Sequence, residues 1–321
     1  MYLADVRSRE NELLASITST LGSVIKIDST RKIAKKLSGK YAYNAHWVTN
    51  VGNEFGQILN SVLTTSEGNG LSNLASGLMD RYRDAEAPPP EVLYTDRDCC
   101  NDNVKELQVR LDVWHFMRRL SYCVTTEAHA LFPQFMQSLS QAIFKWDPED
   151  DQRLRKAKRN ELLQQGVSLV TDEAISRAIR PTERALHCKR KTRGSEETIH
   201  LIDSLIENLK GPEGNDLLGV PLFNKMRIDE VWSSQRRHVE CLQDPPDIAL
   251  YLRTGARTKG GVRLPVYRCA RGSTSLESFH SHLCRFIPGE LFLLPFLSFI
   301  QHTFQSLFEL DTCSVVYFQF S

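Results

Sequence analysis

Three acidic residues stand at places in the chain where carboxylates could converge. Asp28 ends the apolar run VIKID (24–28), Asp96 ends the similar run VLYTD (92–96), and Glu277 stands in STSLESFH (273–280). Loops at strand ends often carry function, and carboxylate oxygens are hard ligands that suit Mg²⁺ or Mn²⁺. Two such ions about 4 Å apart can activate a water or a hydroxyl and stabilise the leaving oxygen of a phosphodiester. If the three side chains meet, the chemistry they predict is metal-dependent phosphoryl transfer.

Each of these residues also has a purely structural interpretation. Asp28 precedes Ser-Thr and the basic segment RKIAKKL, so it could cap a helix. Asp96 begins DRDCCND, where a turn is as natural. Glu277 follows Thr274 at capping-box spacing, so its carboxylate could satisfy a backbone N–H. Spacing alone leaves both interpretations open.

The elements needed to position these residues can be read from the hydrophobic pattern. LGSVIKID (21–28) predicts a buried strand, and 43–51 and 56–67 predict a hairpin around the turn-like GNEFG. Residues 70–86 have Leu71, Leu74, Leu78 and Tyr82 at helical spacing, and VRLDVWHFMRRL (109–120) fits either a strand or a helix. The first part of the chain is therefore rich in β-structure.

The later segments change in character. Residues 125–253 predict a series of helices that begin with Asp, Ser or Thr. The Gly-rich TGARTKGGVR (254–263) predicts a turn, 264–270 a strand, and 273–286 a helix with Leu276, Phe279, Leu283 and Phe286 on one face. Residues 290–321 are Phe-rich and contain no Lys or Arg, and the pattern does not show which element they would pack against.

Composition limits the classes of function. The 321 residues carry 40 Lys and Arg against 39 Asp and Glu, a net charge of +1, so bulk attraction to nucleic acid or anionic lipid is not expected, although local patches are allowed. A hydrophobic content of 41% with 25% charged residues is typical of a globular protein and excludes collagen-like, low-complexity and coiled-coil chains.

Cysteine usage and the apolar segments bear on location. The 8 cysteines show no C-x-x-C pair and no Cys/His zinc spacing, and the charged start MYLADVRSRENELL is unlike a signal peptide. We therefore expect reduced cysteines and a nuclear or cytoplasmic protein that is not secreted. Polar residues and Pro295 interrupt Leu291–Phe308, so no membrane span and no membrane partner is expected.

The order of these elements and four sequence blocks resemble a known family. A strand with Asp, a hairpin, a helix, a second strand with Asp, a helical insertion and a returning helix with Glu is the layout of a polynucleotidyl-transferase core. The blocks are VLYTDRDCC, LDVWHFMRRL, FKWDPEDDQRL and LPVYRCARGSTSLESFHSHLCRFIPG. Over about residues 21–289 the chain resembles the RNase H-like core of DDE/DDD transposases, among the eukaryotic groups with a large helical insertion (Mutator-like, hAT-like and Kyakuja-Dileera-Zisupton elements).

The resemblance implies an α/β fold with a mixed five-stranded sheet and a large all-helical insertion. The expected parts are an N-terminal helix (1–20), the first part of the core (21–124), the insertion (125–253), a returning strand and helix (254–289) and a divergent tail (290–321).

The resemblance also implies the residues of a site. Asp28, Asp96 and Glu277 would be the catalytic carboxylates and would hold two Mg²⁺ or Mn²⁺ ions. His115 would match the histidine of a Cys-x-x-His motif, with Asp112 at the cysteine position, and His280 is a further accessory candidate. Core packing is the alternative role for Trp114 and His115.

Partners follow from the same resemblance. DNA, as transposon ends or target, is the expected partner, and a homo-oligomer is a second expectation. The basic runs RKIAKK (31–36), RLRKAKR (153–159) and KRKTR (189–193) could contact phosphates. Each could equally be a solvated face, and KRKTR could be a nuclear-import signal.

Two departures from the transposase pattern limit the expected activity. We see no separate DNA-recognition module, and the chain departs from the family style after RFIPG (285–289). We therefore expect a core that is truncated and inactive at present, with ancestral metal-dependent cleavage and transfer of DNA strands. The alternatives are a non-catalytic DNA-binding or protein-interaction scaffold and a non-functional fragment.

Overall fold

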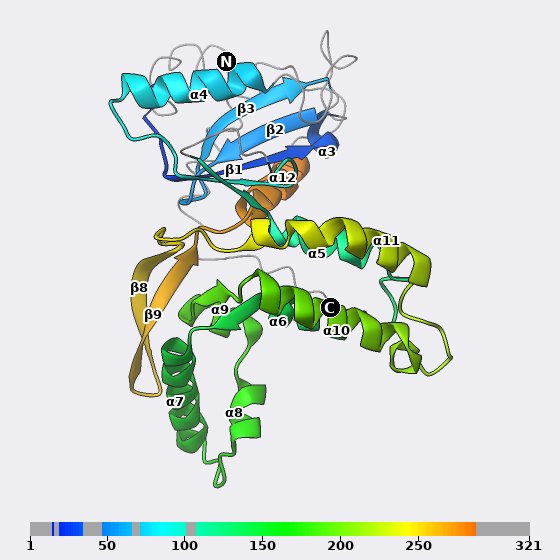
Figure 1. The fold of residues 1–321 in the computed structure, drawn as a ribbon. Helices are drawn as coiled ribbons and strands as arrows, with labels where there is room; N and C mark the ends of the chain where they lie inside the picture. Colours follow the sequence, from blue (N-terminus) through cyan, green and yellow to red (C-terminus); the bar gives the residue numbers. More distant parts are fainter. Residues whose placement is uncertain (1–14, 16–18, 35–46, 66–70, 101–106, 287–321) are drawn as a thin grey trace. The chain divides into compact units, whose positions relative to one another are not determined.

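The computed structural model describes residue 15 and residues 19–34, 47–65, 71–100 and 107–286 (Figure 1). These residues form two compact units. The first contains the described residues up to Trp114 and those from Arg271 onward, and the second runs from His115 to Ala270. The predicted N-terminal helix (1–20) lies almost entirely outside the described residues, and the 290–321 tail lies wholly outside them.

A mixed five-stranded sheet forms the centre of the first unit, which confirms that part of the predicted fold. Its strand order is β3-β2-β1-β4-β5. β1 pairs antiparallel with β2 and parallel with β4, β2 pairs antiparallel with β3, and β4 pairs parallel with β5. The bounds are β1 Val24–Thr30, β2 Trp47–Gly52, β3 Ile58–Thr64, β4 Val92–Thr95 and β5 Gln108–Leu111.

One face of this sheet is an apolar core covered by helix α4 (Ser72–Asp84) (Figure 1). The helical spacing seen in the sequence is confirmed, because Leu74, Leu78 and Tyr82 are buried against Ile25 and other sheet residues. Successive residues of a strand point to opposite faces. The residues between the apolar positions of β1 therefore face the other side.

That other side mixes polar residues such as Lys26 and Asp28 with buried apolar ones such as Val24. It carries helix α12 (Thr274–Phe286), which contacts β1, β2 and the short helix α3 (Arg31–Ala34). The helix approaches the sheet closely at Gly52, where an added Cβ would lie 2.9 Å from Leu276 Cδ2. Leu276, Phe279 and Leu283 are buried, as the sequence predicts. The side chain of Phe286 lies outside the described residues.

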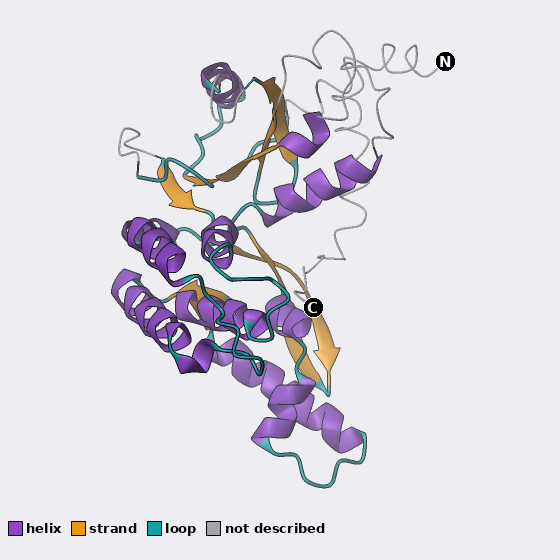
Figure 2. Cartoon of the chain, turned by 90° about the vertical axis from the view of Figure 1, so that its right-hand side faces the viewer, coloured by secondary structure: helices purple, strands orange, loops and turns teal. Residues whose placement is uncertain are grey.

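The second unit consists largely of helices (Figure 2). Helix α5 crosses the unit boundary, so the predicted segment 109–120 contains both a strand and a helix. The α-helices are α5 Val113–Ser121, α6 Phe132–Ile143, α7 Pro148–Gln164, α8 Asp172–Ala178, α9 Pro181–His187, α10 Ser195–Lys210 and α11 Lys225–Gln235. Short 3₁₀ helices are η1 Pro212–Gly214, η2 Arg236–His238 and η3 Glu240–Leu242.

The prediction of an all-helical insertion is wrong, because β6 (Phe144–Trp146) and β7 (Arg190–Thr192) form an antiparallel pair within it. The aromatic residues just after α6 explain the pair. The Arg190 guanidinium lies over the Phe144 ring, 4.1 Å from its centroid, and also stacks near Trp146. Strands of three residues, far apart in the chain, leave no periodic signal in the sequence.

The segment 254–270 also differs from the prediction. Residues 254–259, expected in a turn, belong to strand β8 (Tyr251–Lys259). Gly260 and Gly261 have φ values of +50° and +73° and form a two-residue hairpin loop into β9 (Val262–Cys269). β9 is the predicted strand, but it pairs with β8 in a separate sheet of the second unit and does not join the five-stranded sheet. Leu264 of β9 is buried against α7, and this packing holds β9 within the second unit.

Candidate functional site

Asp28 lies within β1, and Asp96 follows the end of the adjacent parallel strand β4 in the first unit. The pairing of the two strands runs from Val24 and Val92 to Lys26 and Tyr94, so both aspartates lie beyond it, toward the C-terminal ends of the strands. The predicted strand with Asp28 is longer than expected, because β1 continues to Thr30. Asp28 therefore does not cap helix α3, and Thr30 Oγ1 accepts a hydrogen bond from Lys32 N instead, at 3.3 Å.

Glu277 of α12 meets Asp28 on this face of the sheet. One carboxylate oxygen of each residue lies within 4.8 Å of the other. Asp28 is buried, with 4% of its surface exposed, and Glu277 is half-buried. Since α12 begins at Thr274, Thr274 is the first helical residue and not the cap, so Glu277 does not stand at the third helical position that a capping box requires.

Asp96 is the more open of the carboxylates. It follows the end of β4, its side chain is 23% exposed, and Arg97 Nε lies 3.5 Å from its Oδ2. It is not among the residues whose ligand atoms come within 4.8 Å of both Asp28 and Glu277. Asp96 thus lies just beyond the C-terminal end of β4, and its role as third carboxylate stays a prediction.

Asp112 is committed to hydrogen bonds that hold two helices. It is 1% exposed, its Oδ1 accepts from Trp114 N at 2.9 Å, and its Oδ2 accepts from Ser273 N at 3.2 Å and from the Ser273 hydroxyl. These bonds join the start of α5 to the start of α12. The carboxylate that stands at the cysteine position of the resemblance therefore positions the helix that carries Glu277.

His280 lies beside the carboxylate pair, one turn along α12 from Glu277. Its Nδ1 is 3.4 Å from Asp28 Oδ2, and its Nε2 is 2.7 Å from Asn50 Nδ2. The ring is buried, with 4% exposed. The contact places His280 beside Asp28, and its accessory role stays a prediction.

The other accessory candidate, His115, belongs to the second unit, since the boundary falls just after Trp114. It lies on the first turn of α5 and is half-buried, and its accessory role stays a prediction. Trp114 is 36% exposed, so core packing is not its role.

Several described side chains of the basic runs form contacts within their own unit. In the run 153–159, Arg153, Arg155, Lys158 and Arg159 all form ion pairs, with acidic residues of α7, α8 and α9. In the run 189–193, which lies on β7, Arg193 pairs with Glu197. From the run 31–36, Arg31 stacks over Trp47 in the first unit. Several of these basic side chains therefore have partners within the chain, and phosphate contact by the three runs stays a prediction.

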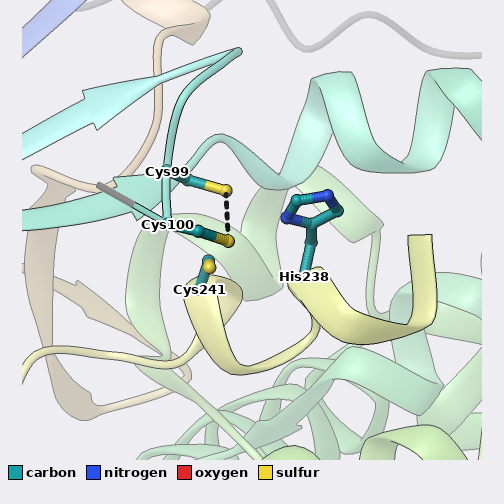
Figure 3. A group of neighbouring side chains, drawn as sticks. All are labelled: Cys99, Cys100, His238 and Cys241. Atoms are coloured by element: carbon teal, nitrogen blue, oxygen red, sulfur yellow. Dashed lines mark hydrogen bonds between the residues drawn. The ribbon is translucent and has the colours of Figure 1, made fainter. Parts of the chain in front are cut away.

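Cysteine and histidine side chains form two further pairs of metal-ligating type, both drawn in Figure 3. Cys99 and Cys100 belong to the first unit, with their Sγ atoms 3.9 Å apart. His238 and Cys241 belong to the second, at the end of η2 and within η3, where a separation of three residues follows a helical turn. Each pair by itself supplies half of the four ligands of a structural zinc site.

Sequence reasoning missed the polar residues that surround Asp28 inside the sheet. Asn50 is fully buried and Lys26 is 3% exposed, and Lys26 Nζ donates to Ser275 Oγ at 3.4 Å. In β1 a signal was present, because Lys26 and Asp28 alternate with the apolar Ile25 and Ile27. Asn50 lies directly opposite Asp28 in the β1–β2 register, so the polar positions of the two strands coincide.

Comparison with protein-family models, with curated proteins and with solved structures gives no match. Among the described residues, no helix has the length and apolar character required to cross a membrane.

Proposed function

We propose that the first unit is an RNase H-like core that binds divalent cations at Asp28, Glu277 and Asp96, and that its ancestral chemistry is metal-dependent cleavage and transfer of DNA strands. The observation that carries the proposal is the meeting of Asp28 and Glu277, within 4.8 Å, on the face of the sheet that α12 contacts. The sequence of elements around them supports it. A strand with Asp, a hairpin, a helix, a second strand followed by Asp, and a returning helix with Glu occur in that order.

The donor set fits a hard divalent cation. Two ionised carboxylates at this separation repel each other, and burial strengthens the repulsion, so a cation or a proton stabilises the pair. Carboxylate oxygens suit Mg²⁺ or Mn²⁺ better than softer metals. Asp28 is held inside the structure, whereas a surface acidic cluster is free to turn toward water.

The positions of the residues indicate what the bound ions would supply and what the protein would supply. When bound, such ions supply Lewis-acid stabilisation and an activated oxygen nucleophile for phosphodiester chemistry. The chain contributes positioning. The sheet fixes Asp28, the hydrogen bonds of Ser273 to Asp112 fix the start of the helix that carries Glu277, and the partly exposed Asp96 follows the end of β4. DNA is the substrate that the resemblance implies.

A non-catalytic scaffold is the second candidate, and one observation favours it. Leu217 and Leu218, adjacent residues between η1 and α11, are fully or almost fully exposed, and Met226 nearby in sequence is 77% exposed. Contiguous exposed apolar patches mark surfaces that bind other proteins, and these three exposed side chains belong to one segment, 217–226. This function would persist after loss of the carboxylates.

The test is Mn²⁺ binding by calorimetry to the full chain and to Asp28→Asn, Glu277→Gln and Asp96→Asn variants. We expect binding by the wild type and its loss in the first two variants, with a weaker effect at Asp96. Glu91→Gln is the matched control, because Glu91 is exposed and precedes β4 at the opposite end of that strand from Asp96. Absence of binding by a folded wild type would rule out the catalytic proposal, and binding would justify strand-transfer assays with nicked and branched DNA.

A further inference from the structure

The short strand pair β6–β7 of the second unit places two lysines directly opposite each other. The antiparallel register pairs Lys145 with Lys191, and both side chains are exposed. The Cβ atoms of directly opposite residues lie about 4.5–5.5 Å apart, and like charges at this spacing destabilise a strand pair. Among the described residues, neither lysine has a carboxylate within ion-pair distance. The fold thus brings together two positive charges whose repulsion a bound anion would relieve.

Other basic side chains of the run 189–193 are already compensated by carboxylates. Lys189 Nζ lies 3.9 Å from Asp150 Oδ2, and Arg193 forms an ion pair with Glu197 at 2.8 Å. Lys191 differs from these two, because no described carboxylate balances its charge. Its charge is therefore available to a partner outside the chain.

The hairpin β8–β9 carries a second group of exposed cations. Arg253 and Arg257 lie on β8 and Arg263 lies on β9, and all three side chains are exposed. None of them forms an ion pair with a carboxylate in the described part of the chain. The segment 248–276, which contains the whole hairpin, has no Asp or Glu. In a chain with a net charge of +1, the hairpin is therefore a local concentration of positive charge.

A β-bulge aligns two of these arginines. The register shifts at Thr254, between Arg253 and Gly255. Arg253 pairs with Tyr267, which lies on the same face of β9 as Arg263 because alternate residues of a strand share a face. Arg253 and Arg263 therefore project from one face of the hairpin, although they belong to different strands.

Packing within the second unit holds the hairpin in place. Helix α7 lies beside it (Figure 1), and Leu264 of β9 is buried against that helix. Asn160 Nδ2 of α7 donates to the Gly260 carbonyl oxygen in the hairpin loop, at 2.7 Å. At the other end, Arg190 N of β7 donates to the Tyr251 hydroxyl at 3.1 Å, which links the two strand pairs. Both groups of cations thus lie on packed backbone, so binding a partner requires little ordering of the chain.

The kind of side chain exposed on these strands indicates the class of partner. Among the described residues, the large exposed apolar side chains all lie outside the two strand pairs. Protein interfaces and membrane-bound surfaces bury apolar side chains at the contact, whereas Lys and Arg alone suit phosphate groups. The major groove of B-DNA admits a two-stranded β-ribbon, while the deep, narrow major groove of double-stranded RNA does not. The partner that fits best is duplex DNA.

We propose that the strand pairs β6–β7 and β8–β9 form a surface that binds the phosphate backbone of duplex DNA through Lys145, Lys191, Arg253, Arg257 and Arg263. This basic strand surface uses no residue of the first unit and no metal ion. It adds a DNA-binding surface to the proposed function, and it does not depend on the carboxylates.

The experiment measures binding of the full chain to a fluorescein-labelled DNA duplex of arbitrary sequence by fluorescence anisotropy, in EDTA. Salt is varied between about 50 and 200 mM, because each phosphate contact contributes about 0.9 to the slope of log K against log salt concentration. We expect Lys145→Gln/Lys191→Gln to bind more weakly and to reduce this slope by about 2. The triple variant Arg253→Gln/Arg257→Gln/Arg263→Gln should reduce it by about 3.

The matched control is Arg159→Gln/Arg236→Gln. It removes the same charge as the lysine variant from the same unit, but these arginines pair with Asp172 and Asp203. The control should keep the wild-type slope. An equal decrease in the control and in the lysine variant would show that net charge determines binding and would overturn the proposal. All three variants change exposed side chains, so each should melt at the wild-type temperature.

The remaining outcomes test the partner and separate this inference from the proposed function. Wild-type slopes in both the lysine and the arginine variants would overturn the proposal. Tighter binding to duplex RNA, or to vesicles of phosphatidylserine and phosphatidylcholine, would overturn the choice of duplex DNA. A folded wild type that binds Mn²⁺ but no duplex refutes the basic strand surface alone. One that binds the duplex in EDTA but no Mn²⁺ refutes the carboxylate site alone.

Discussion

Asp112 and Ser273, 161 residues apart, are joined by two hydrogen bonds to a single carboxylate oxygen, one from the Ser273 backbone N–H and one from its hydroxyl. The other oxygen of Asp112 accepts from Trp114 N. One buried side chain therefore sets the starts of both α5 and α12. The candidate site depends on this link, because α12 carries Glu277 and His280.

Replacing Asp112 should destabilise the first unit. Asp112→Ala removes a helix cap and leaves buried donors of Ser273 without their acceptor, so we expect a loss of about 2–4 kcal/mol in the free energy of unfolding. Urea unfolding followed by tryptophan fluorescence measures this. Asp84→Ala, at the exposed end of α4, is the control and should change stability by less than about 0.5 kcal/mol. Equal midpoints for the two variants would contradict the role of Asp112.

Gly52 tests the close approach of α12 to the sheet. In Gly52→Ala the new Cβ would lie 2.9 Å from Leu276 Cδ2 and 3.2 Å from the Gln57 carbonyl oxygen. We expect a destabilisation of about 1–3 kcal/mol from overpacking, together with weaker Mn²⁺ binding, because Leu276 is the neighbour of Glu277.

The control for this prediction is Gly77→Ala. Gly77 lies within α4, and an added Cβ there meets nothing within 4 Å. Alanine favours a helix interior over glycine by about 0.8–1 kcal/mol, so this variant should be more stable than the wild type. Differential scanning calorimetry should show a lower melting temperature for Gly52→Ala and a higher one for Gly77→Ala than for the wild type. A melting temperature of Gly52→Ala that rises like that of Gly77→Ala would show that α12 moves aside without cost.

Parts of the fold could be predicted because their signal is local. The apolar spacing in α4 and α12 and the strand-like runs of β1 to β3 are visible in short windows of sequence. The pairing of β8 with β9 was not visible, because glycines and charges in 254–263 are as typical of a turn as of a hairpin with a tight loop. The parallel placement of β4 and β5 depends on long-range packing that no local pattern contains.

Some residues of the candidate site could likewise be predicted from local sequence, and others could not. Asp28 and Glu277 could be selected because each stands in a recognisable element, and their meeting required the tertiary structure. Asn50 was overlooked because a single polar residue inside a strand does not reveal what lies across from it. Its partner His280 is 230 residues away, and only the packing of α12 on the sheet brings them together.

His187 should make the second unit sensitive to mild acid. Its ring is 1% exposed and Nδ1 donates to the Pro265 carbonyl oxygen at 2.6 Å. Burial lowers the pKa of His187 below 6.5, and the Lys259 and Arg257 charges lower it further, against the opposing effects of the Pro265 carbonyl and Glu183. The unfolded chain therefore binds the proton more readily. Stability is present above about pH 6.5 and is lost as the pH falls through the folded-state value.

The measurement for His187 is the free energy of unfolding between about pH 7.5 and 5, where unperturbed histidine titrates. His187→Asn can retain a donor to Pro265 and cannot titrate, so its stability should fall less steeply with pH than that of the wild type. His200→Asn, at an exposed position of α10, should leave the slope unchanged. Parallel slopes for wild type and His187→Asn would show that the histidine does not contribute.

Cysteine reactivity should separate buried from exposed thiols. Burial and the nearby charges of Asp151 and Asp150 raise the pKa of Cys188 to about 12, and burial also raises the pKa of Cys123. The thiolate is the reactive form, so at pH 8 both side chains should resist alkylation as long as the second unit is folded. The exposed Cys100 should react within the same period. Iodoacetamide labelling followed by peptide mass spectrometry, with and without urea, measures this, and rapid labelling of Cys188 in the native chain would contradict the packing of α7 against β9 that buries it.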